Sequence, residues 1–133
     1  MEFEELKEFG NDKKKLINKY RSIADDLETL KQVLEIMPDE RPPISSRINN
    51  LGIETCIIKV KKIACKSLKG KGVYSGLRLV YAHYKNQPTT TENSDTEQTM
   101  EEIIEKEKIV LIELYQKSDK EQEDRDRISK HFT

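Results

Sequence analysis

The sequence predicts a single α+β domain spanning residues 1–133, with the element order helix, helix, strand, strand, strand, helix. Apolar residues recur at a spacing of three to four over residues 11–37, which is typical of amphipathic helices. Residues 55–65 and 76–85 are rich in β-branched and aromatic side chains, which favours strands. A chain of 133 residues fits one domain.

Residues 11–37 predict two consecutive helices, arranged as a hairpin with one apolar stripe on each. The stripes are formed by Leu16, Ile17, Tyr20 and Ile23, and then by Leu27, Leu30, Val33 (or Leu34) and Met37. Ser22 and Asp25 resemble a capping box, so the second helix is expected to begin at Ser22. Prolines at positions 38, 42 and 43 end that helix and begin an irregular segment.

Three strands are expected after a turn at residues 49–52. The first covers about 55–65, and a loop at 67–74 with two glycines leads to the second, at 76–85. The third, 109–115, has four consecutive apolar residues followed by alternation, which indicates a central strand buried on both faces. Ser118 or Asp119 is expected to cap a last helix at about 120–130.

The segment between the second and third strands is polar. Residues 86–100 are rich in Thr, Asn, Gln, Ser and acids and cannot bury enough apolar surface to offset the entropy of ordering. Residues 101–108 fit either a helix or an extension of the third strand. The sequence therefore predicts a flexible insertion at about 86–106 within one domain.

Composition points to a cytoplasmic protein. No apolar run approaches the roughly 18 residues that span a bilayer, and the acidic start Met-Glu-Phe-Glu-Glu is unlike a secretory signal. Cys56 and Cys65 are nine apart in one predicted strand, so they should lie on opposite faces, beyond disulfide reach. Reduced cysteines, no metal site, no cofactor and no membrane contact are expected.

Positive charge is concentrated in one stretch of the chain. The chain holds 24 Lys and Arg and 25 Asp and Glu, for a net charge of −1, yet residues 55–91 contain no acid. The cations of this stretch are Lys59, Lys61, Lys62, Lys66, Lys69, Lys71, Arg78 and Lys85. Such a block is the electrostatic footprint of a polyanion site.

Short motifs in this stretch resemble the RelE/ParE toxin superfamily of type II toxin–antitoxin systems. They are Ile58-Lys59-Val60-Lys61, Ser67-Leu68-Lys69-Gly70 and Ser75-Gly76-Leu77-Arg78-Leu79-Val80-Tyr81, with Ile112-Glu113-Leu114-Tyr115-Gln116-Lys117 resembling the last strand. The resemblance implies N-terminal helices packed on one side of a small curved antiparallel sheet. It also implies a cognate antitoxin as partner, in a heterotetramer.

For the RelE branch, the resemblance implies cleavage of mRNA on the ribosome. Metal-free RNA cleavage must deprotonate the 2′-hydroxyl, stabilise the pentacoordinate phosphate and protonate the 5′-oxygen. Arg78 matches the family's phosphate-binding Arg, and a guanidinium binds two phosphate oxygens at once. Lys59 and Lys61 are two apart on one strand face, where either one could act as a base or both as a solvated basic surface.

The remaining candidates are phosphate contacts and proton donors. Lys66, Lys69 and Lys71 in the loop, Lys62 on the opposite strand face and His83 are candidates for binding RNA phosphates. Several branches of the family use a C-terminal Tyr or His as acid or base, and the candidates here are Tyr115, Lys117 and His131. Tyr81 is expected to be a core aromatic residue with its hydroxyl at an edge.

Two other functions fit the same residues. A ParE-like protein would inhibit DNA gyrase and would not need the Arg78 and lysine cluster. A catalytically inactive member of the fold would keep the basic sheet to bind nucleic acid or protein. The nuclease is favoured because Arg78 and the Lys59/Lys61 pair suit phosphate chemistry.

Overall fold

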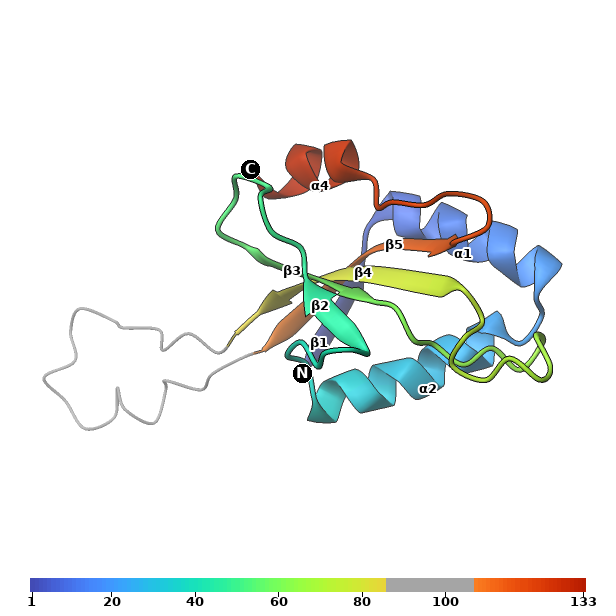
Figure 1. The fold of residues 1–133 in the computed structure, drawn as a ribbon. Coiled ribbons are helices and arrows are strands. Elements are labelled where there is room, and N and C mark those ends of the chain that lie inside the picture. The colour runs from blue at the N-terminus through green and yellow to red at the C-terminus, as the bar shows by residue number, and fades with distance from the viewer. Residues whose placement is uncertain (86–106) are drawn as a thin grey trace, which may run out of the picture.

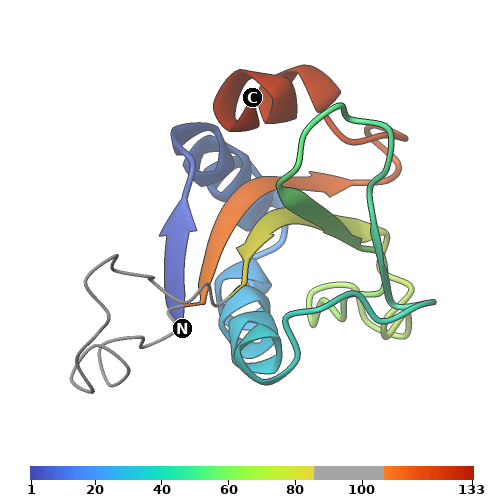
Figure 2. The same ribbon diagram turned by 90° about the vertical axis from the view of Figure 1, so that its left-hand side faces the viewer.

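The computed structural model describes residues 1–85 and 107–133, so the predicted insertion at 86–106 lies outside the described residues. A sheet of five strands lies between the N-terminal helices on one face and a short C-terminal helix on the other (Figures 1 and 2). The α+β class and this arrangement confirm the prediction. No helix of the described residues is long and apolar enough to cross a membrane.

The strand order is β1-β5-β4-β3-β2. The strands are β1 (Glu2–Glu5), β2 (Ser45–Arg47), β3 (Cys56–Val60), β4 (Leu77–Tyr84) and β5 (Lys108–Gln116). β2, β3, β4 and β5 pair antiparallel in turn, whereas β1 pairs parallel to β5. The sheet is therefore mixed. The three predicted strands correspond to β3, β4 and β5, which pair antiparallel as expected, whereas β1 and β2 were not predicted.

The two helices before the sheet are α1 (Lys7–Lys19) and α2 (Ile23–Ile36). α1 begins four residues earlier than predicted, so that Phe9 joins the core with no exposed surface. α2 begins directly after Ser22, as predicted, but the Ser22 side chain donates to Asp26 Oδ2 at 2.7 Å instead of capping a backbone N–H. Apolar side chains of both helices pack on the sheet residues Ile58, Leu79 and Leu111.

A second apolar layer covers the opposite face of the sheet. It contains Ile57, Val80 and Ile112 from the strands and Ile128 from α4 (Arg125–Phe132). Asp124 caps α4 by accepting from the backbone N–H of Arg127 at 3.0 Å. The prediction of a helix from about 120 with a cap at Ser118 or Asp119 was wrong, because those residues form a turn after β5 in which Asp119 N donates to Gln116 O at 2.9 Å.

β3 is shorter than predicted. It ends at Val60, and Cys65 lies beyond it, so the premise that Cys56 and Cys65 share one strand was wrong. Both cysteines are free thiols. Burial raises the pKa of the Cys56 thiol, which favours its protonated, unreactive form.

Candidate functional site

Arg78 and Tyr115 are direct partners across β4 and β5. They lie on the face that α4 covers, because Val80, two residues along β4, belongs to the apolar layer on that side. Val80 in turn is flanked by Lys59 of β3 and Glu113 of β5. The sheet register thus brings two cations, a phenol and a carboxylate into adjoining rows.

The segment between β5 and α4 adds charged groups to these rows. Lys59 Nζ donates to Glu123 Oε1 at 3.3 Å, and only 9% of Glu123 is exposed. Glu113 is 1% exposed; its carboxylate accepts from Lys120 Nζ and, at 2.8 Å, from the backbone N–H of Asp124. Each buried carboxylate therefore faces a lysine, as a buried charge requires.

Tyr115 has a buried hydroxyl with no hydrogen-bond partner among the described residues. Burial, with Glu123 and Glu113 nearby, raises the pKa of Tyr115 to about 12. The phenol therefore keeps its proton at neutral pH. An unpaired buried O–H is rare in folded proteins.

Arg78 is held at the edge of this face. Its Nη1 donates to Lys61 O at 2.6 Å and to Leu77 O at 3.2 Å, which leaves other N–H groups of the guanidinium for a ligand. Lys61 lies one residue past β3, with its side chain exposed. Arg78 thus contacts the backbone of Lys61, and Lys59 faces Glu123. Because β3 ends at Val60, the premise that Lys59 and Lys61 lie on one strand was wrong.

Gly76 fixes the start of β4. It has φ +86°, and a Cβ there would lie 2.2 Å from Gln116 Oε1. The Gln116 side chain donates to Ser75 O at 3.0 Å and accepts from Lys117 N at 2.9 Å. This close approach places Arg78 beside the end of β5, where Lys117 is exposed.

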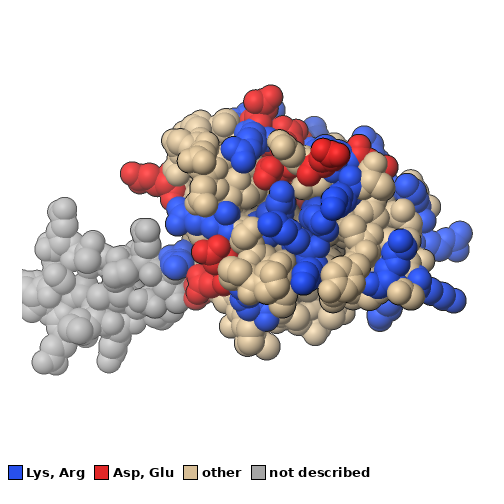
Figure 3. All heavy atoms as spheres, viewed as in Figure 1, with Lys and Arg blue, Asp and Glu red and all other residues tan. Residues whose placement is uncertain are grey.

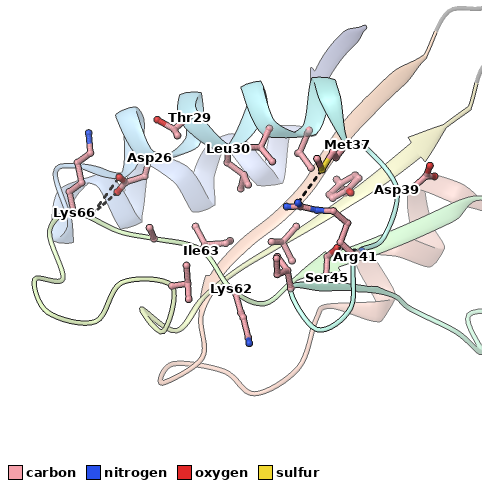
Figure 4. A pocket seen from close by; sticks show the side chains of 17 residues that line it. Asp26, Thr29, Leu30, Met37, Asp39, Arg41, Ser45, Lys62, Ile63 and Lys66 are labelled. Carbon is pink, nitrogen blue, oxygen red and sulfur yellow. Dashed lines mark hydrogen bonds between the residues drawn. The ribbon is translucent and has the colours of Figure 1, made fainter.

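The other lysines of the basic block follow the connection between β3 and β4. Lys66, Lys69 and Lys71 are exposed there, and Lys62 extends away from α2 (Figure 4). Lys and Arg side chains gather across the middle and right of the face in Figure 3, and acidic ones lie towards the top and on the left. Three of the predicted phosphate-binding lysines, Lys66, Lys69 and Lys71, are therefore exposed in the connection that follows Lys61.

The two histidines lie elsewhere. His83 is 3% exposed, with Nδ1 3.6 Å from Asp39 Oδ1 and Nε2 3.3 Å from Glu107 Oε2. An imidazole buried between carboxylates is not open to a phosphate. His131 Nε2 lies 2.9 Å from Glu8 Oε2 of α1, so it contacts that helix rather than the Arg78 region.

Tyr81 is fully buried, and its hydroxyl donates to Pro38 O at 2.7 Å. Tyr81 is a core aromatic residue, as predicted, and burial raises the pKa of its phenol.

A groove of about 370 Å³ lies on the other side of the sheet, between α2 and the segments that flank β3. Its lining is mostly apolar and includes Leu30 and Ile63 (Figure 4). Each end carries both signs of charge, with Asp26 and Lys66 at one and Asp39 and Arg41 at the other. Lys66 N donates to Asp26 Oδ2 at 3.2 Å at one end, and Arg41 Nη1 contacts Met37 Sδ at 3.1 Å at the other. Nothing in the sequence pattern predicted this groove.

Sequence reasoning missed Glu113, Glu123 and Lys120. Glu113 breaks the apolar run of β5, which is the one signal that could have revealed a buried carboxylate. Glu123 and Lys120 reach the site through the turn after β5, which no periodicity encodes. Among the described residues, no group of three or more His, Cys, Asp or Glu could hold a metal ion.

No family model, curated protein or solved structure matches this chain. Its function is therefore argued from the geometry of the site.

Proposed function

We propose that this protein is a toxin of the RelE-like type that cleaves mRNA on the ribosome without a metal. The observation that carries the proposal is the pairing of Arg78 with the unpartnered phenol of Tyr115, beside the Lys59–Glu123 ion pair. A hydrogen-bond donor for the phosphate, a protonated phenol and a carboxylate lie on one face of the sheet. RNA cleavage through the 2′-hydroxyl needs these three kinds of group.

Each group has one role in this proposal. Arg78 and Lys59 bind the non-bridging oxygens of the scissile phosphate and stabilise the charge that develops on them. Glu123 accepts the proton of the attacking 2′-hydroxyl, in place of a lysine base. Tyr115 donates its proton to the departing 5′-oxygen, which requires that RNA binding expose its buried hydroxyl. The cleavage leaves a 2′,3′-cyclic phosphate on the other fragment.

The exposed lysines hold the rest of the RNA. Lys61, Lys69 and Lys71 lie on the connection that continues from the site, and ammonium groups bind the phosphate backbone without reading sequence. RNA phosphates release their bound counterions when lysines bind them, so the affinity of the protein for RNA should fall as the salt concentration rises.

The groove beside α2 suits the antitoxin partner that the proposal requires. Its apolar lining fits the apolar stripe of an amphipathic helix, and the charged side chains of both signs at its ends offer partners for polar residues beside that stripe. Met37 lines this groove and is 48% exposed, whereas the neighbouring Ile36, 78% exposed, does not line it. Met37→Glu should therefore block neutralisation by the antitoxin, and Ile36→Glu should not.

A catalytically inactive binding protein is the second candidate. It is favoured by the two ion pairs that engage lysines of the site, Lys59 with Glu123 and Lys120 with Glu113. In that case the carboxylates serve only to hold the segment before α4 on the sheet. RNA binding would then occur without cleavage.

Inducible expression separates these candidates. The nuclease arrests growth when the antitoxin is absent, and new mRNA 5′ ends appear within coding regions. Arg78→Ala abolishes both effects while the variant accumulates to the wild-type level. Growth arrest with intact mRNA and damaged DNA would instead indicate a gyrase inhibitor.

A further inference from the structure

Tyr74 has the most exposed aromatic ring among the large apolar side chains of the described residues, with 73% of its surface exposed. The ammonium of Lys62 lies 5.4 Å from the centre of this ring. A ring this exposed buries little apolar surface, and a cation–π contact at an exposed site contributes only about 0.5–1 kcal/mol. The position of Tyr74 therefore needs a different explanation.

The backbone beneath the ring is fixed. Tyr74 forms a β-bridge with Ile63, and its N–H donates to Lys71 O at 2.9 Å. The next residue, Ser75, is 5% exposed, and its hydroxyl donates to Ile63 O at 2.5 Å. Because the backbone is held on both sides, little entropy is lost when a flat ligand settles on the ring.

The surroundings of Tyr74 are cationic. Residues 55–85, the described part of the acid-free stretch, place Lys62 at the ring and Lys69 and Lys71 in the same connection. Ile63, the bridge partner of Tyr74, lies two residues after Lys61, whose carbonyl oxygen accepts from Arg78. Tyr74 is thus held by the same segment after β3 that contacts Arg78.

Tyr84 provides a natural comparison. It is 39% exposed, and Lys108 Nζ lies 5.8 Å from its ring centre. Lys108 is also paired with Glu4 at 3.0 Å, so its charge is shared with a carboxylate. Tyr84 thus has the same pairing of a ring with an ammonium group, but the Glu4 carboxylate beside it disfavours binding of a polyanion.

We propose that Tyr74 and Lys62 form a stacking platform for a nucleobase of single-stranded RNA whose backbone continues to Arg78. The base packs on the ring face, and the ammonium holds an adjoining phosphate. Stacking on an aromatic residue tolerates every base and acts on unpaired strands. The inference rests on the proposed function, since it assumes that RNA reaches Arg78.

The test measures binding of a fluorescent single-stranded RNA oligonucleotide to the purified full chain. Tyr74→Ala should weaken binding on the order of 5- to 100-fold, as for loss of one base–aromatic stack. Tyr74→Phe should bind like wild type, because the ring remains. Tyr84→Ala should have no effect, and every variant should melt at the wild-type temperature.

The salt dependence of RNA affinity distinguishes the loss of base stacking from the loss of a charge. Tyr74→Ala should keep the wild-type slope of log affinity against log salt, whereas Lys69→Gln should reduce it. Equal binding by Tyr74→Ala and wild type, no binding of the oligonucleotide by wild type, or an equal loss in Tyr84→Ala would overturn the inference.

Cleavage of ribosome-bound mRNA, measured in parallel, distinguishes the two proposals. Cleavage by wild type with no effect of Tyr74→Ala on binding defeats the stacking platform alone. Binding that depends on Tyr74 without any cleavage supports the platform and defeats the nuclease.

Discussion

Lys59 Nζ of β3 donates to Glu123 Oε1 at 3.3 Å, which joins the middle of the basic block to the segment before α4. Both side chains are shielded from water, with 17% and 6% of their side-chain surfaces exposed. A lysine proposed from the sequence as a possible base therefore stands against a carboxylate. This contact makes Glu123 the better candidate for the base.

Glu123→Gln should abolish cleavage and spare binding. The amide keeps the shape of the carboxylate but cannot take a proton, so the rate should fall roughly 10²- to 10⁴-fold. RNA affinity should stay equal or rise, because Lys59 loses its ion pair. Cleavage of an mRNA in a purified translation reaction measures the rate.

Glu121→Gln is the matched control, because Glu121 is an exposed acid two residues away. It removes the same charge and should leave the rate unchanged. Tighter RNA binding by Glu123→Gln together with a full rate would show that Glu123 merely shields Lys59.

Tyr115→Phe should separate catalysis from stability. The hydroxyl is buried without a partner, so its removal should leave the free energy of unfolding unchanged or raise it by up to about 1 kcal/mol. Cleavage should nevertheless fall, because the proton donor is lost. Urea denaturation and the translation reaction give the two readouts, and a stable variant with a full rate would exclude Tyr115 as the acid.

The raised pKa of Tyr115 predicts a loss of stability at high pH. The group ionises near 10 when unfolded and at about 12 when folded. Its contribution is therefore complete below pH 10 and lost as pH rises towards 12, since the unfolded state releases the proton first. Urea unfolding between pH 9 and about 12 should show a smaller loss for Tyr115→Phe than for wild type.

Gly76→Ala should destabilise the fold more than Gly70→Ala. Both glycines have positive φ, +86° and +81°, but a Cβ meets nothing within 4 Å at Gly70. Gly70→Ala should cost about 1 kcal/mol for the left-handed conformation alone. Gly76→Ala should cost about 3 kcal/mol, because Gln116 must also leave its hydrogen bonds. Equal losses in urea denaturation would contradict the close approach.

His131→Ala should leave cleavage intact. The imidazole contacts Glu8, and this hydrogen bond lowers the pKa of the Glu8 carboxyl. Removal of a general acid would instead cost roughly 10²- to 10⁴-fold. A loss of that size, measured at fixed pH beside Tyr115→Phe, would move the acid from Tyr115 to His131.

Periodicity revealed the parts of the fold that have enough residues to show it. α2, β4 and β5 have long apolar patterns and were predicted closely. β1 and β2 were missed because they have four and three residues, mostly polar, and exist through pairing with distant strands. Tertiary pairing overrides local propensity in such short strands.

The residues of the candidate site also differ in how far the sequence pattern could predict their positions. The predicted strands contain Lys59 and Arg78, and the register of β3 and β4 fixes the face on which each side chain lies. Strand alternation could not place Glu123, which depends on the turn after β5, nor the burial of His83 between Asp39 and Glu107. Contacts made by turns and loops depend on the folded chain, not on spacing.

We propose that RNA cleavage requires Arg78, which binds the scissile phosphate. The most direct test of this requirement is a purified translation reaction in which mRNA 5′ ends are mapped after addition of wild type, Arg78→Lys or Arg78→Ala. We predict cuts in ribosome-bound mRNA with wild type, strongly reduced cutting with Arg78→Lys because a point charge cannot bind two oxygens, and none with Arg78→Ala. Intact mRNA with wild type, or full cutting by a folded Arg78→Ala, would contradict the account.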